Sequence, residues 1–169
     1  LLLRLSSTQE IDISMARVSI VIPAYNVELY LSQTLKFALA SDYEDFEIIV
    51  VNDGSHDRTE EVARSFGGKV RVIAQANGGM SAARNKGISS TDSEFIALLD
   101  ADDLWHPQKL GLQVHLLQQR PEIGLVFGEF KLWDGIADPV FPKQRIGGEL
   151  VPELGGWIYH NLVLTNWAL

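Results

Sequence analysis

The chain has 169 residues, of which 46% are hydrophobic and 21% charged, a profile typical of one globular domain with a full hydrophobic core. Its formal net charge of −8 argues against nucleic acid as the main partner, because binding a phosphate backbone requires a basic surface. The chain contains no cysteine, which excludes disulfides, thiolate catalysis and cysteine metal sites. No apolar stretch of the sequence is long enough to predict a transmembrane helix.

Residues 1–14 show no clean hydrophobic period, and Met15 stands directly before a strong strand pattern. The apolar run Leu1–Leu5 is too short for the core of a signal peptide and carries its charge in the wrong place. We therefore expect residues 1–14 to be a disordered leader, or a segment that is not native. Residues 15–169 are expected to form one domain.

From residue 18 onward, patterns typical of strands alternate with patterns typical of helices. The β-branched run Val18–Ile22 predicts a buried strand that Pro23 ends. Asp57, with Glu60 three residues later, predicts a capping box at the start of the second helix. Strands are expected at 18–22, 46–51, 70–74, 95–99 and 125–132, and helices at 28–40, 57–66, 81–88 and 107–119. This alternation predicts an α/β fold with a mainly parallel sheet and helices on both of its faces.

Polar clusters follow four of the expected strands. In order along the chain, they are residues 24–26, Asp53, residues 77–79 and residues 100–103. Ligands bind to parallel sheets beyond the carboxyl ends of the strands, where these clusters fall. The sequence therefore predicts one site that is built from four loops.

The last of these clusters holds three carboxylates, Asp100, Asp102 and Asp103, at the end of the strand expected at 95–99. Like charges this close repel one another, so the arrangement favours a bound cation. Mg²⁺ and Mn²⁺ prefer oxygen ligands and often take only one or two of them from protein. In the alternative interpretation, Asp102 or Asp103 caps the helix expected at 107–119.

The other clusters are typical of nucleotide contacts. The Asp53 carboxylate can accept hydrogen bonds from a base N–H or a ribose hydroxyl, although Asp-Gly is also common in simple turns. Gly78 and Gly79 permit a close approach of the backbone to a ligand. Arg84 adds positive charge near the start of a helix, although it can also be an ordinary surface residue.

Together these motifs resemble those of family 2 glycosyltransferases, closely from residue 18 to 119 and loosely beyond. The matching segments, in the same order and spacing, are Val21–Asn26, Val51–Ser55, Gly79–Gly87 and Leu98–Asp103. The resemblance implies a Rossmann-like GT-A fold and inverting transfer of a sugar from a nucleoside diphosphate sugar, with UDP as the expected nucleotide. It also implies Mn²⁺ or Mg²⁺ as cofactor and a glycan, a lipid-linked compound or another hydroxyl compound as acceptor. A role in polysaccharide or cell wall biosynthesis would follow, in the cytoplasm or at the inner face of the membrane.

The resemblance also implies the roles of single residues. The nucleotide would be bound by Pro23, Ala24, Tyr25, Asn26, Glu28, Asp53, Gly78, Gly79, Arg84, Asn85, Asp100 and Ala101. The metal would be held by Asp102, with Asp100 as a second ligand.

One part of the family pattern is missing. The general base of the family is a carboxylate in a later segment, often in a Glu-Asp pair, and no such pair follows Val126. We expect the base beyond Leu169, and the chain to stop before the acceptor half. Two alternatives stay open: a nucleotide-sugar-binding module without catalysis, and a haloacid-dehalogenase-like phosphatase with Asp100 as its nucleophile. The phosphatases usually carry this motif on their first strand, whereas here it follows the fourth.

Overall fold

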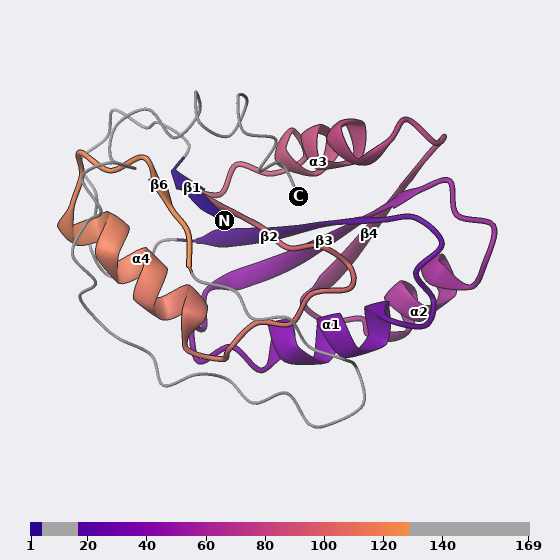
Figure 1. Cartoon of the computed structure of the whole chain (residues 1–169), viewed down its shortest axis with the longest axis horizontal. Coiled ribbons are helices and arrows are strands. Elements are labelled where there is room, and N and C mark those ends of the chain that lie inside the picture. Colours follow the sequence, from indigo (N-terminus) through magenta and orange to yellow (C-terminus); the bar gives the residue numbers. More distant parts are fainter. Residues whose placement is uncertain (5–16, 129–169) are drawn as a thin grey trace. The chain divides into compact units, whose positions relative to one another are not determined.

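A computed structural model describes residues 1–4 and 17–128 of the chain (Figure 1). Within these ranges, six strands form one sheet in the order β4-β3-β2-β5-β1-β6. The strands are β1 (Leu2–Arg4), β2 (Val18–Ala24), β3 (Phe46–Asp53), β4 (Val70–Gln75), β5 (Phe95–Leu98) and β6 (Leu125–Val126). The helices are α1 (Leu31–Leu39), α2 (Thr59–Ser65), α3 (Met80–Ile88) and α4 (Lys109–Gln119).

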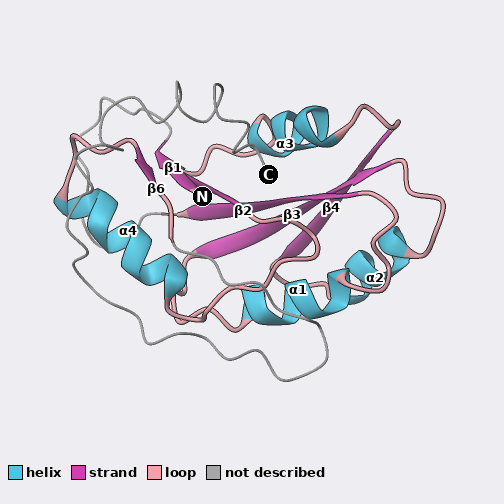
Figure 2. Ribbon diagram, viewed as in Figure 1, coloured by secondary structure: helices cyan, strands magenta, loops and turns pink. Residues whose placement is uncertain are grey.

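The sheet is mainly parallel, as the alternating pattern predicts. Strands β2, β3, β4 and β5 pair in parallel, whereas β1 runs antiparallel to both β5 and β6. Helices α1, α2 and α4 cover one face of the sheet, and α3 lies on the other (Figure 2). The predicted α/β fold with helices on both faces is therefore confirmed.

Helix α3 approaches the sheet closely because it carries a glycine where it crosses β2. A Cβ atom added to Gly87 would lie 2.3 Å from Cγ1 of Val21, which is closer than any side chain can come. On the same face, Ala83 packs against Ile49 and Val51 of β3. The small residues of α3 thus let the helix backbone lie directly on the strands, as small core residues generally do.

Strand β2 continues through Pro23 to Ala24, so the prediction that Pro23 ends it is wrong. The pairing of β2 with β5 ends at Val21, whose carbonyl accepts a hydrogen bond from the Leu99 N–H. Pro23 lies two residues further on, so its nitrogen faces the same side, beyond the end of β5. Proline lacks an N–H, and here the ladder requires none.

The amino-terminal residues contradict the expectation of a disordered leader where the structure describes them. Leu2, which is fully buried, lies in β1 between β5 and β6. An apolar side chain with a place in the core gives these few residues a reason to form a strand. Residues 5–16 of the expected leader, and residues 129–132 of the expected fifth strand, lie outside the described part.

The predicted capping box is also absent. The Glu60 carboxylate accepts hydrogen bonds from Asn52 Nδ2 at 2.8 Å and Arg64 Nε at 2.9 Å instead of reaching back to Asp57. Asp57 still accepts a hydrogen bond from the Thr59 N–H at 3.0 Å. Among the described helices, none is long and apolar enough to cross a membrane.

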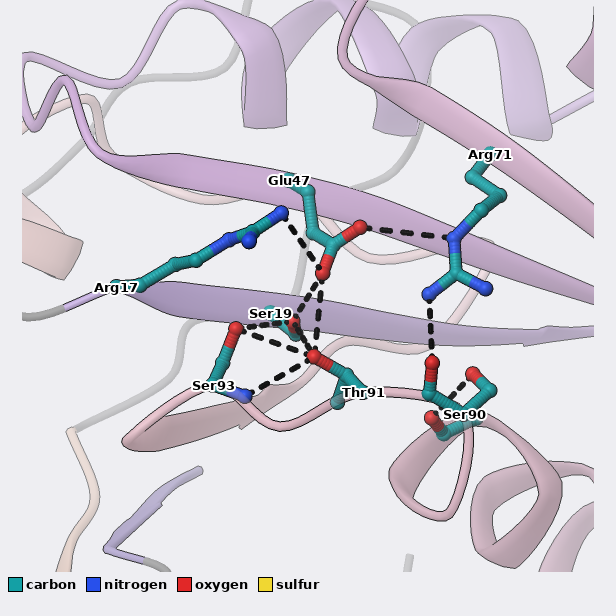
Figure 3. A network of polar contacts seen from close by, with 8 residues as sticks. Arg17, Ser19, Glu47, Arg71, Ser90, Thr91 and Ser93 are labelled. Carbon is teal, nitrogen blue, oxygen red and sulfur yellow. Dashed lines mark hydrogen bonds and ion pairs between the residues drawn. The ribbon is translucent and has the colours of Figure 1, made fainter.

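A polar network ties together the amino ends of three parallel strands (Figure 3). Glu47 is the second residue of β3, and its Oε1 accepts hydrogen bonds from Ser19 Oγ of β2 at 2.8 Å and from Thr91 Oγ1 at 3.2 Å. Arg17 and Arg71 form ion pairs with the same carboxylate at 3.5 and 3.6 Å. This amino-end network lies at the edge of the sheet opposite to the loops described next.

Candidate functional site

Four loops leave the carboxyl ends of the parallel strands, where the sequence predicts a site. They are the first loop (25–30) after β2, the second loop (54–58) after β3, the glycine loop (76–79) after β4 and the acidic loop (99–106) after β5. Since the strands are parallel, all four loops begin at the same edge of the sheet. Hydrogen bonds between them build the candidate site.

The first and second loops hold each other through reciprocal hydrogen bonds. The Val27 N–H donates to Thr59 Oγ1 at 2.8 Å, and the Glu28 N–H donates to Asp57 Oδ2 at 3.1 Å. In return, the Arg58 N–H donates to Glu28 Oε2 at 2.8 Å. Each loop thereby satisfies backbone donors of the other, so neither conformation is independent of its neighbour.

Asn26 completes this clasp between the loops from a left-handed backbone conformation, with φ of 51°. The Asn26 Oδ1 accepts a hydrogen bond from the His56 N–H at 2.8 Å, and its own N–H donates to Ser55 Oγ at 3.0 Å. Asn26 and Glu28, both predicted nucleotide ligands, thus use side-chain oxygens to bind the second loop. Their neighbour Tyr25 is 46% exposed and presents an open aromatic ring.

Asp53 lies at the end of β3 and is only 3% exposed. Its Oδ1 accepts hydrogen bonds from Gln75 Nε2 at 2.7 Å and the Gly78 N–H at 2.9 Å, and its Oδ2 accepts one from the Gly79 N–H at 2.8 Å. Burial by itself would raise the pKa of Asp53, but these three donors outweigh it and hold the pKa below the ordinary value. The ionised carboxylate therefore fixes the glycine loop.

The two glycines of this loop differ from the expectation in one respect. Their N–H groups point to Asp53, so these donors are already used by the protein. Gly54 of the second loop has a φ of +72° and packs against the glycine loop. A Cβ added to Gly54 would lie 2.8 Å from the backbone nitrogen of Asn77. Gly54 thus serves close packing between the two loops, whereas Gly79 adopts a positive φ of +85° with open space around it. The predicted approach to a ligand is left to the exposed surface of Gly78 and Gly79.

The acidic loop is anchored at several points. Arg84 Nη2 of α3 forms an ion pair with Asp100 Oδ1 at 2.6 Å, and both side chains are largely buried, being 15% and 25% exposed. The Asp103 N–H donates to the Asp100 carbonyl at 3.1 Å, which closes a turn. Ala101 is buried in the core, and its carbonyl accepts a hydrogen bond from Thr34 Oγ1 of α1 at 2.8 Å.

Asp102 differs from Asp100 in being exposed. It forms no hydrogen bond or ion pair with any residue that the structure describes. Burial, together with the negative charges of Asp100 and Asp102, raises the pKa of Asp103. The acidic loop therefore carries more negative charge than Arg84 balances, and a cation would relieve the excess.

Within residues 1–4 and 17–128, no three histidine or carboxylate side chains are grouped so that they alone could hold a metal ion. A cation at Asp102 would thus complete its shell with water or with oxygens of a ligand, which is the usual arrangement for Mg²⁺ with phosphates. The donor set of one free carboxylate beside a paired one fits such an ion. Arg84 also has a buried Nε without a partner among the described residues, which is a further polar atom left open.

Two sets of predicted residues contact each other in the structure. Asp53 contacts Gly78 and Gly79, and Arg84 contacts Asp100, whereas Pro23 and Ala24 are buried in β2. Asn85 is exposed on α3, and no contact joins it to this set.

Gln75 and Thr34 are among the contributors that the sequence did not reveal. Gln75 and Thr34 each donate one hydrogen bond to the site loops, to the Asp53 carboxylate and to the Ala101 carbonyl respectively. A polar residue on an otherwise inward-facing apolar side of a helix is the signal that could have revealed Thr34. The others on that side, Leu31, Leu35 and Ala38, are all apolar.

Comparison with known proteins identifies the class to which this arrangement belongs. Residues 19–145 match the model of glycosyl transferase family 2, and the chain belongs to this family. It is 37% identical over 153 residues to an uncharacterised glycosyltransferase of Rickettsia felis, covering 84% of this chain and 25% of that protein. It is 43% identical over 136 residues to one of Rickettsia typhi, covering 78% of this chain and 43% of that protein. The chain thus spans less than half the length of these curated relatives.

Solved structures share the fold. TarS of S. aureus (residues 1–349), also known in complex with UDP-GlcNAc, is 25% identical with a TM-score of 0.58, covering 62% of this chain and 33% of TarS. A mannosyltransferase of Pyrobaculum calidifontis, known in complex with GDP-Man and Mn²⁺, is 24% identical with a TM-score of 0.56. The match covers 62% of this chain and 33% of the mannosyltransferase. The GT-A fold implied by the resemblance is confirmed.

Family membership leaves the phosphatase alternative without support. Asp100, which would have been the nucleophile, is instead held by Arg84 at 2.6 Å.

Proposed function

We propose that this chain is the donor-binding part of an enzyme that transfers a sugar from a nucleoside diphosphate sugar to an acceptor hydroxyl. The observation that carries the proposal is the division of roles in the acidic loop. Arg84 holds Asp100, while the exposed Asp102 is left free beside it. UDP is the proposed nucleotide, supported by the likeness to TarS, which is known with UDP and with UDP-GlcNAc.

In this proposal, the loops make different contacts with the nucleotide sugar. Tyr25, which is exposed, offers an aromatic face on which the base can stack. The glycine loop, fixed by Asp53, forms the adjoining wall. Asp100 keeps its Oδ2 open as an acceptor for a hydroxyl of the ligand, because its only described ion pair uses Oδ1.

The metal belongs to the same proposal. Asp102 would hold Mn²⁺ or Mg²⁺, with Asp100 as a second ligand through the same Oδ2, whose two lone pairs allow it to bind the ion and accept a hydrogen bond. When bound, such an ion supplies positive charge to the diphosphate that leaves the sugar. The protein's own contribution is to present one free carboxylate from a turn that is anchored on both sides.

The remaining features of the reaction stay predictions. Inversion at the anomeric carbon requires a general base that deprotonates the acceptor hydroxyl. Since the chain spans less than half the length of its relatives, we place this base, and the acceptor site, in a part of the protein outside residues 1–169. We further propose a glycan, a lipid-linked compound or another hydroxyl compound as acceptor, a role in polysaccharide synthesis and a cytoplasmic location. Binding of a nucleotide sugar without catalysis is the alternative function.

The first experiment is calorimetric titration of the chain with UDP, with and without Mn²⁺, on wild type and Asp102→Asn. We expect Mn²⁺ to strengthen UDP binding in the wild type, and Asp102→Asn to remove that gain because the ion loses its free carboxylate. Asp92→Asn, which changes another exposed aspartate in the connection between α3 and β5, is the matched control and should bind as the wild type does. Equal metal dependence in wild type and Asp102→Asn would contradict the assignment of the ion to Asp102.

Other nucleotides extend the same test. GDP, ADP, CDP and dTDP titrated under identical conditions show whether the base is read as proposed. If none of these diphosphates binds, with or without metal, the proposal that the chain binds a sugar donor is wrong. Turnover of a UDP-sugar by the longer protein then separates a transferase from a module that only binds.

A further inference from the structure

Thr34 is a buried hydroxyl on a helix that otherwise turns an apolar side to the core. It is 1% exposed and lies among Leu31, Leu35 and Ala38, the other buried residues of α1. A hydroxyl in such surroundings is costly unless it is hydrogen-bonded. Threonine in a helix commonly satisfies this need by bonding to a carbonyl of its own helix.

Thr34 instead donates outside its helix, to the acidic loop. Its Oγ1 lies 2.8 Å from the carbonyl oxygen of Ala101, a residue 67 positions away in the chain. Ala101 stands between the two carboxylates of the Asp100-Ala101-Asp102 motif and is itself 5% exposed. A buried carbonyl in a loop has no partner in a sheet ladder, so the hydroxyl supplies the hydrogen bond that this carbonyl needs.

The contact is one of four described here that hold residues 99–103 of the acidic loop. Leu99 is held by the carbonyl of Val21, Asp100 by Arg84, and the turn is closed by the Asp103 N–H on the Asp100 carbonyl. Three of these contacts act on Leu99 or Asp100. The Thr34 hydrogen bond acts on the peptide unit that joins Ala101 to Asp102, and the Asp103 N–H belongs to the peptide unit that follows Asp102.

We infer that Thr34 is a positioning residue for the metal ligand: by holding the Ala101 carbonyl, it sets the direction in which the Asp102 carboxylate is presented. This inference rests on the proposed function, because it gives Asp102 a metal to bind. It also links two parts of the site, since α1 begins directly after the first loop and holds the acidic loop through its fourth residue. Partners that orient a metal ligand without touching the metal commonly influence metal affinity strongly.

The test compares Thr34→Val, which keeps the shape but removes the hydroxyl, with Thr34→Ser, which keeps the hydroxyl. Free Mn²⁺ is measured by electron paramagnetic resonance while the ion is titrated into protein saturated with UDP. We expect Thr34→Val to weaken Mn²⁺ binding about tenfold or more, and Thr34→Ser to remain within about twofold of the wild type. UDP binding without metal should be the same in all three proteins.

Ser93→Ala is the matched control, because Ser93 is an equally buried hydroxyl (2% exposed) in the amino-end network at the opposite edge of the sheet. It should bind Mn²⁺ as the wild type does. Thr34→Ala, which introduces no new methyl group beside the loop, replaces Thr34→Val if the valine prevents folding.

Unchanged Mn²⁺ affinity in folded Thr34→Val or Thr34→Ala would overturn the role of Thr34 while leaving the proposed function intact. Equal weakening in Ser93→Ala would overturn it too, because the effect would then be one of general stability. A wild-type chain that binds no Mn²⁺ in the presence of UDP, GDP, ADP, CDP or dTDP would instead overturn the metal site of the proposed function, and with it this inference.

Discussion

Asp53 and Asp102 are carboxylates at the same edge of the sheet with opposite surroundings. Asp53 is 3% exposed and accepts three hydrogen bonds, whereas Asp102 is exposed and has no partner among the described residues. A carboxylate whose lone pairs are occupied by protein donors mainly serves structure, and one left free can serve a ligand. Asp53 therefore fixes the glycine loop, and Asp102 is the carboxylate to which the proposed function assigns the metal.

The surroundings of Asp53 predict a specific dependence of stability on pH. Its pKa in the folded protein is lowered from the ordinary value of 3.8, despite burial, because Gln75, Gly78 and Gly79 donate hydrogen bonds to the charged form. As pH falls, Asp53 therefore takes up a proton more readily in the unfolded chain than in the folded protein. Its contribution to the free energy of unfolding is complete above pH 3.8 and is lost as the pH falls through the lowered pKa. We expect acidification to lower the free energy of unfolding, measured by urea denaturation, more in the wild type than in Asp53→Asn.

Comparing the two proteins removes the effect of other carboxylates with lowered pKa values, such as Asp57 and Glu60, which are common to both. Parallel curves of unfolding free energy against pH for wild type and Asp53→Asn would show that Asp53 is not held in its charged form.

Helix α3 is the element that carries Arg84 to the acidic loop. Its height above the sheet is set by Gly87 on Val21 and by Ala83 on β3. Because Arg84 is next to Ala83 in sequence, a shift of this helix would move the guanidinium away from Asp100. Packing between a helix and a sheet thus controls an ion pair in the site.

Substitution of Gly87 by alanine tests this dependence. Alanine is favoured over glycine in an open helix position, but here its methyl group would meet Val21 at 2.3 Å. We expect Gly87→Ala to lower the free energy of unfolding by about 1–3 kcal/mol and to weaken UDP binding. Chemical denaturation and calorimetry measure the two effects.

Gly124→Ala serves as the control, since a Cβ at Gly124 would meet nothing within 4 Å. If Gly87→Ala proved as stable as Gly124→Ala, the close contact between α3 and β2 would not exist as described.

The amino-end network stabilises the strands at the edge away from the site. Removal of the Glu47 carboxylate would leave the hydroxyls of Ser19 and Thr91 only each other and Ser93 as partners, and would take from Arg17 and Arg71 their shared ion-pair partner. We expect Glu47→Ala to lower the free energy of unfolding by about 1–3 kcal/mol, because the network loses the charged acceptor of two hydrogen bonds. UDP affinity at the far edge should not change, and Glu61→Ala, at an exposed position on α2, should leave both quantities unaltered. A loss of UDP affinity in Glu47→Ala would show that the two edges are coupled.

The whole sheet combines segments that lie far apart in the chain. Strand β1 at the amino terminus pairs with β5 and β6, so that residues 2–4 complete a sheet whose parallel part begins only at residue 18. Leu2, fully buried, packs in the main core with residues of β2, β5 and α4. The first residues of the chain therefore contribute to the stability of the fold.

Substitution of Leu2 measures this contribution. We expect Leu2→Ala to lower the free energy of unfolding by about 2–5 kcal/mol, since it leaves a cavity in the core. Leu29→Ala makes the same chemical change at a side chain that is 78% exposed, and should alter stability by less than about 0.5 kcal/mol. Equal unfolding free energies for the two variants would mean that β1 is not part of the stable sheet.

The order and type of the elements from β2 to α4 were predictable, because hydrophobic periodicity and the residues that begin or end helices and strands are local features of the sequence. The convergence of Asp53, the glycine loop and Asp100 on one edge followed from parallel topology alone. Strand β1 was not predictable, because three residues have no period and depend on partners about 90 and 120 positions away. The contacts of Glu60 and Thr34 likewise depend on tertiary neighbours, which local patterns such as the capping box do not contain.

The clasp between the first and second loops has a consequence for protein engineering. Side-chain oxygens of Asn26 and Glu28 accept hydrogen bonds from the backbone N–H groups of residues 56 and 58. In return, the Asp57 carboxylate accepts one from the Glu28 N–H. A chimera that takes residues 25–30 from a relative and keeps residues 54–58 would break these matches, even if each segment were well formed in its parent. The two segments form one structural unit, so a chimera between family members should exchange both segments together.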